Sequence, residues 1–139
     1  MAVNLSESSS ENSSNFQLIL DSFLSSAGLP FSNLLSTDRI ARIFAKHNGL
    51  FSTHGIYSTA VMVWSFLGQV LRDGKEASCQ SAVARVMTHC QLTGKTTPAA
   101  DTRNYFRARA KLSVPTLREI SGEIAAELKE AAEENWLVS

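Results

Sequence analysis

Apolar residues recur at intervals of three and four through most of this chain, the spacing that places side chains on one face of an α-helix. The first run, with Phe16, Ile19, Leu20, Phe23 and Leu24, ends before Gly28 and Pro30. The pattern predicts six helices: from Phe16 to before Gly28, from Ser36-Thr37-Asp38 to before Asn48-Gly49, from Tyr57 to Arg72, from Ser78 to Leu92, from Asp101 or Thr102 to Leu112, and from Thr116 onward.

Local signals mark several of these boundaries. Asp73-Gly74 stops the third helix, and Gly94 follows the fourth. Ser113-Val114-Pro115 is expected to break the chain before a capping box of Thr116 and Glu119 opens the last helix. Apolar residues wrap most of the third helix, so we expect it to be the central buried element.

No convincing strand remains, and the fold class is therefore all-α. Residues 15–139 are expected to form one compact helical domain, in which the fourth and fifth helices resemble a helix-turn-helix with a long turn. Residues 1–14 are rich in Ser, Asn and Glu and nearly free of apolar side chains. Such a segment buries too little surface to offset its ordering entropy, which predicts a disordered tail.

The net charge of zero hides a strong asymmetry along the chain. Residues 39–118 carry 12 Lys and Arg against three acidic residues, giving +9. Residues 1–38 carry −4, and residues 119–139 carry −5. A basic middle between acidic ends indicates either a polyanionic partner or internal charge pairing, and composition alone leaves both open.

Export and membrane insertion are not expected. No Lys or Arg precedes residue 39, so the positive region of a secretory signal is missing. The longest apolar stretch, Ala60 to Leu71, is shorter than the roughly 20 residues that a spanning helix needs. With only Cys79 and Cys90 in the chain, a disulfide scaffold is excluded and a reducing cytoplasm is the expected location.

The fifth predicted helix carries the strongest functional signal. Its polar residues Arg103, Asn104, Arg107 and Lys111 fall within an arc about 100° wide, opposite Tyr105, Ala108 and Leu112. A helix with one cationic face and one packed face suits a nucleic-acid groove, where Arg binds phosphates or the edge of guanine. Arg85 on the preceding helix and Lys95 in the connection are candidates for contacts with backbone phosphates.

Two other interpretations of this face remain open. It can be a solvated helix surface, or it can pair with the glutamates of the last helix. In the second case the chain is a helical protein–protein interaction module without DNA binding. Self-association is a further expectation.

No catalytic or metal centre is evident in the sequence. Gly94-Lys95-Thr96 has His89 where a phosphate-binding loop needs its first Gly, and no strand precedes it. On one helix, Cys79 and Cys90 stand about 16 Å apart, beyond the span of a disulfide or of a single zinc ion. No cofactor is therefore expected in this chain.

The stretch from about Phe51 to Trp136 resembles the N-terminal region of insertion-sequence transposases of the four-type DDE family. The residues that carry the resemblance are Phe51-Ser52-Thr53, the apolar run Val63 to Leu71, Asp73-Gly74, Ser78 to Arg85 and, above all, Asp101 to Leu112. Their order and spacing together are more specific than any one piece.

The resemblance implies DNA transposition by an Asp, Asp, Glu core that uses two divalent metal ions, Mg²⁺ being expected. It also implies that the N-terminal helices recognise the terminal inverted repeats of the element, with double-stranded DNA as the partner. No acidic residue here matches the first catalytic Asp, so no catalytic residue is assigned and no activity is expected of this chain alone. We expect a transposase N-terminal domain that stops before the catalytic core. As a DNA-binding domain of this kind, it is expected to associate with the bacterial nucleoid.

Overall fold

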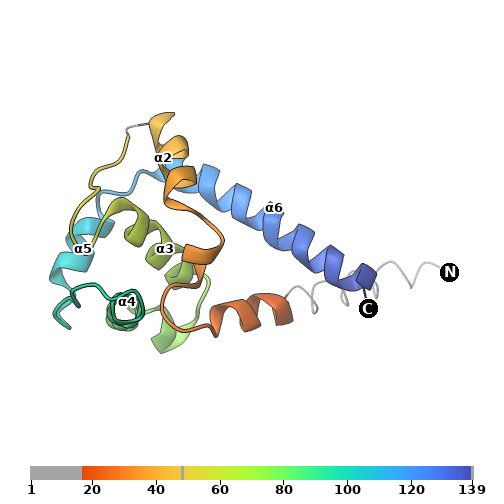
Figure 1. The fold of residues 1–139 in the computed structure, drawn as a ribbon, viewed down its shortest axis with the longest axis horizontal. Coiled ribbons are helices and arrows are strands. Elements are labelled where there is room, and N and C mark those ends of the chain that lie inside the picture. The colour runs from red at the N-terminus through yellow and green to blue at the C-terminus, as the bar shows by residue number, and fades with distance from the viewer. Residues whose placement is uncertain (1–16, 48, 139) are drawn as a thin grey trace.

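Helices form every regular element in the computed structural model of this protein, which describes residues 17–47 and 49–138 (Figure 1). The α-helices are residues 17–24, α2 (Thr37–Ala45), α3 (Thr59–Val70), α4 (Cys79–Leu92), α5 (Arg103–Arg109) and α6 (Val114–Val138). Two short 3₁₀ helices, η1 (Pro30–Asn33) and η2 (Gly74–Ala77), join them. The all-α prediction is confirmed; the predicted tail, residues 1–14, lies outside the described residues.

Serine hydroxyls cap three of the helices at their N-termini. The side chains of Ser36, Ser58 and Ser78 accept hydrogen bonds from the backbone N–H groups three residues later, at 3.1, 3.3 and 3.1 Å. Each bond satisfies an N–H that has no partner within the helix. The helix starts near Ser36 and Ser78 agree with the prediction, whereas α3 begins two residues later than Tyr57.

The predicted break between the last two helices was misplaced. α6 begins at Val114, because Pro115 falls in the first turn, where its missing N–H costs nothing. Thr116 therefore lies inside the helix with its hydroxyl buried, and it does not form the expected capping box. α5 ends at Arg109, three residues early, since the N–H groups of Lys111 and Leu112 bond the carbonyls only three residues back.

α3 lies at the centre of the molecule, as predicted from its apolar sequence (Figure 1). On one side it packs in a cluster with η1, α2 and α6; on the other, Met62 joins Ala82 and Val83 of α4 and Tyr105 and Ala108 of α5. The Trp64 indole N–H donates to the Leu35 carbonyl at 2.7 Å. α4 also contributes Val86 and Cys90 to the first cluster, so it borders both, whereas the buried residues Tyr105 and Ala108 of α5 belong to the second cluster alone.

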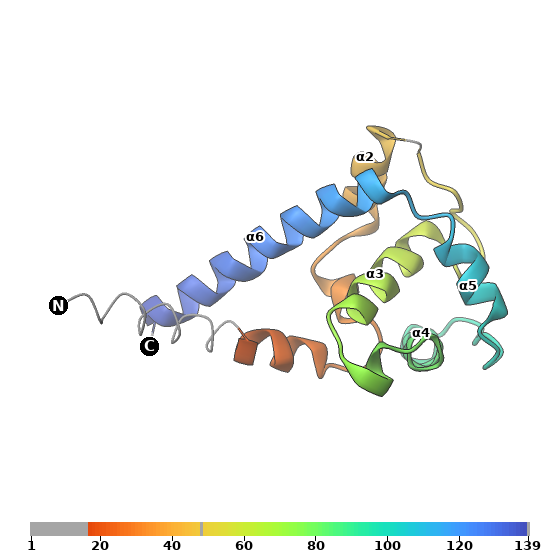
Figure 2. The same ribbon diagram turned by 180° about the vertical axis from the view of Figure 1, so that it is seen from behind.

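α6 packs its first turns on α2 and then extends away from the other helices (Figure 2). Its buried Ile120 and Ile124 pack in the cluster that contains Ile40 and Ile43 of α2. Ion pairs surround this contact: Arg39 with Glu123 and Glu127, and Glu119 with Lys46 and His47. Internal charge pairing, one of the two explanations for the charge asymmetry, therefore holds for α2.

Acid should weaken the contact between α2 and α6. The hydrogen bond from His47 and the charge of Lys46 lower the pKa of Glu119 below its ordinary value. A carboxyl with a lowered folded-state pKa contributes stability above its unfolded pKa and loses that contribution as the pH falls through the folded value. We expect the Tm of Glu119→Gln to depend less steeply on pH in the acid range than that of the wild type, and Glu130→Gln on the exposed part of α6 to retain the wild-type slope. Equal slopes in all three proteins would contradict the role of Glu119.

Candidate nucleic-acid interface

α5 is a helix of seven residues whose two buried side chains fix its orientation. Tyr105 is fully buried and Ala108 nearly so, and both pack against Met62 of α3 and Val83 of α4. They lie three residues apart, on the same side of the helix. The other side of α5 consequently faces solvent.

A buried hydrogen-bond chain anchors Tyr105 to α3. Its hydroxyl donates to Gln69 Oε1 at 2.7 Å and accepts from the Ser65 hydroxyl at 3.2 Å. Gln69 Nε2 in turn donates to the Ala77 carbonyl at 2.9 Å. Burial raises the pKa of the Tyr105 hydroxyl, which keeps it protonated as a donor. These bonds hold α5 in a single orientation on the core.

The outward face of α5 carries Arg103, Asn104 and Arg107, all exposed, as the helical spacing predicts. Arg103 and Arg107 are one turn apart, so their side chains leave the helix about 6 Å from each other. Lys111 differs from the expectation, because the helix has ended before it. It lies in the following turn, exposed, with its ammonium 5.9 Å from the centre of the Phe51 ring. A cation at this distance is still available to a phosphate.

Arg109, which the sequence analysis passed over, borders this face. Its guanidinium lies 5.0 Å from the centre of the Phe66 ring, and Nη1 donates to Gln69 Oε1 at 3.4 Å. Because Arg109 is half-buried against α3, it stabilises the position of α5 and is less accessible to a phosphate than Arg103 and Arg107 are. The sequence alone does not distinguish Arg109 from Arg103 and Arg107, because the three lie close together along the chain. The contacts of Arg109 with α3 are visible only in the tertiary structure.

Asp101 partly neutralises one end of the basic face. Its carboxylate accepts from the backbone N–H of Arg103 at 2.7 Å and forms an ion pair with Arg103 Nη2 at 3.0 Å. Those hydrogen bonds lower the pKa of Asp101. The Arg103 side chain nevertheless remains 81% exposed, and exposed ion pairs of this kind are weak. A phosphate can therefore displace or share this partner.

The glutamates of α6 do not neutralise the face of α5 within the part of the chain that the structure describes. Glu119, Glu123 and Glu127 are engaged with α2, as described above, and none of the ion pairs among the described residues joins α5 to α6. The alternative in which the basic face pairs with the last helix thus finds no support in these residues.

Two of the expected phosphate contacts lie apart from this arrangement. The Arg85 side chain is only 13% exposed; its Nη1 lies 3.6 Å from Glu76, and its other nitrogens are buried without partners. Burial lowers its pKa, and in this position it cannot reach a phosphate. Lys95 is exposed in the connection between α4 and α5, near His89. Unlike Arg85, it is therefore accessible to a backbone phosphate.

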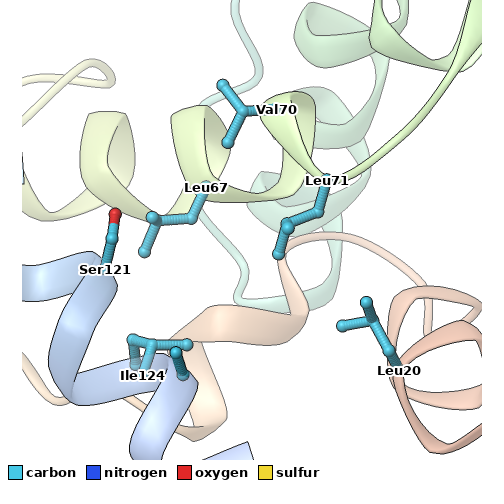
Figure 3. A pocket seen from close by; sticks show the side chains of 7 residues that line it. Leu20, Leu67, Val70, Leu71, Ser121 and Ile124 are labelled. Atoms are coloured by element: carbon cyan, nitrogen blue, oxygen red, sulfur yellow. The ribbon is translucent and has the colours of Figure 1, made fainter. Parts of the chain in front are cut away.

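An apolar cavity lies on the side of α3 that faces α6. This cavity of about 210 Å³ opens between residues 17–24, α3 and α6, lined by Leu20, Leu67, Val70, Leu71, Ser121, Ile124 and Ala125 (Figure 3). Ser121 is its one polar residue, so it offers no set of groups for acid–base or metal chemistry. In the described residues no three His, Cys, Asp or Glu side chains come together to hold a metal ion.

Comparison with protein-family models, curated proteins and solved structures gives no match for this chain. The resemblance to transposase N-terminal regions stays a prediction that rests on the residues quoted for it. None of the described helices is both long and apolar enough to cross a membrane.

Proposed function

We propose that this chain binds double-stranded DNA through the exposed face of α5. One observation carries the proposal: Arg103 and Arg107 project together from a helix that Tyr105 fixes on the core. The carboxylates of Glu119, Glu123 and Glu127 on α6 are engaged with α2 instead. The guanidinium group supplies several N–H donors in a rigid plane, a geometry that matches phosphate oxygens and the guanine edge.

The dimensions of α5 suit a groove of DNA. Seven residues make a helix about 10 Å long, and the major groove of B-DNA is about 12 Å wide. Asn104 lies beside the two arginines and can both donate to and accept from a base edge. Lys111 lies in the turn that directly follows the helix, in a position suited to a phosphate of the flanking backbone. Lys95 is exposed in the connection that precedes the helix and can contact a phosphate farther along the backbone.

The resemblance to transposase N-terminal regions supports a narrower target, the inverted repeats at the ends of a mobile element. In that role the chain recognises DNA, and the cleavage and joining steps belong to a metal-dependent core that these residues do not supply. This narrower proposal depends on the resemblance alone, whereas the geometry of α5 also supports the proposal of duplex binding.

Salt dependence of duplex binding tests the proposal. Each phosphate that a cation neutralises contributes about −0.9 to the slope of log Kobs against log salt. With three or four contacts from α5, Lys111 and Lys95, we expect a slope of about −3 between about 50 and 200 mM salt. Fluorescence anisotropy with a labelled duplex of about 21 base pairs measures it. Absence of binding at the lowest salt would contradict the proposal.

A further inference from the structure

Phe106 is an exposed aromatic residue on the basic face of α5. Its 62% exposure contrasts with the full burial of the preceding Tyr105. The other large apolar side chains exposed in the described residues are all aliphatic: Leu18, Leu50, Val70, Leu71, Leu92 and Val114. Phe106 is therefore the one exposed phenyl ring in the described part of the chain, and it lies where the cations gather.

Helix geometry places Phe106 at the edge of the cationic row. It follows Arg103 by three residues, so the two side chains are neighbours on the surface, about 60° apart around the helix. Arg107 lies beyond Arg103 on the other side. Phe106 belongs to neither of the two core clusters. A single exposed aliphatic residue such as Leu92 needs no explanation, but an aromatic ring bordered by arginines combines the two groups that bind bases and phosphates.

We propose that Phe106 stacks on a base at an opened step of the DNA, so that this site prefers DNA containing an unpaired base over a continuous duplex. The inference rests on the proposed DNA binding and specifies its substrate. Aromatic side chains stack on unpaired bases in many proteins that bind nucleic acid, because an unstacked base exposes a flat face that the ring can cover. Arg103 and Arg107 then hold the phosphates on either side of the opened step.

An anionic membrane surface is the other partner that cations and an exposed ring can suit. Helices that bind membranes present a broad apolar face along several turns. On α5 the apolar side chains of Tyr105 and Ala108 are buried, which leaves Phe106 with only the small Ala110, directly after the helix, on the exposed side. One ring among polar neighbours is too narrow for insertion into lipid, and base stacking is the better account.

Two duplexes of the same sequence, one fully paired and one with a single extrahelical 2-aminopurine, test the inference. The wild type should bind the bulged duplex more tightly, with a change in 2-aminopurine fluorescence on stacking. Phe106→Ala should weaken binding to the bulged duplex about tenfold and leave the paired duplex within about twofold. Phe106→Tyr should retain the preference because it retains the ring, and Leu92→Ala, equally exposed on α4, should behave as the wild type.

The outcomes separate this inference from the proposed function. If the wild type binds neither duplex, DNA binding itself fails, and the role of Phe106 fails with it. If it binds both and Phe106→Ala changes neither affinity, or weakens both equally, the stacking role alone is overturned. Binding to phosphatidylserine vesicles that is lost in Phe106→Ala, without any preference between the duplexes, would overturn it in favour of a membrane surface.

Discussion

Replacing Tyr105 with alanine is expected to lower the free energy of unfolding by about 4 kcal/mol. The substitution removes a fully buried ring from the cluster between α3, α4 and α5 and leaves a cavity there. It also leaves Gln69 Oε1 and the Ser65 hydroxyl without the tyrosine hydroxyl that they bond. Urea unfolding followed by circular dichroism measures the loss.

A graded variant and a neighbour control this result. Tyr105→Phe keeps the ring and removes only the hydroxyl, so it should cost about 1–2 kcal/mol, and it stays measurable if the alanine variant fails to fold. Phe106→Ala, one residue along the same helix but exposed, should change stability by less than about 0.5 kcal/mol. If both tyrosine variants matched the stability of Phe106→Ala, Tyr105 would not be the anchor of α5.

The helices could be predicted because their signals are local. Apolar spacing and serine caps act within one or two turns, and Ser36 and Ser78 cap helices where the sequence indicates them. The boundary between α5 and α6 could not be predicted in the same way. A proline after a short break fits either an interruption or the first turn of a helix, and the packing of Ile120 and Ile124 extends α6 to Val114.

In the candidate site, too, the features set by local spacing could be predicted, and those set by tertiary contacts could not. Exposure of Arg103 and Arg107 follows from helical spacing once Tyr105 and Ala108 are buried. The burial of Arg85 beside Glu76 and the position of Arg109 on Phe66 depend on contacts between separate elements, which spacing does not encode. The engagement of Glu119, Glu123 and Glu127 of α6 with α2 is also tertiary, and the spacing of these residues in the sequence does not predict it.

Removing the two exposed arginines of α5 should produce the largest effect on binding. The double variant Arg103→Ala/Arg107→Ala is expected to weaken duplex binding by at least about tenfold at low salt, because two phosphate or base contacts are lost together. Asp101→Asn should act in the opposite direction and strengthen binding. It removes the carboxylate paired with Arg103, and Asn can still accept the Arg103 N–H that starts the helix.

The salt slope of the double arginine variant tests the central claim most directly, measured beside a variant of equal charge. Arg42→Ala with Lys129→Ala removes two exposed cations from α2 and α6, away from α5. We predict that the α5 variant loses about two units of slope in log Kobs against log salt, while the α2/α6 variant retains nearly the wild-type slope. Equal losses in the two variants would show that net charge, and no particular face, attracts the DNA. An unchanged slope in the α5 variant would place the binding site elsewhere on the molecule.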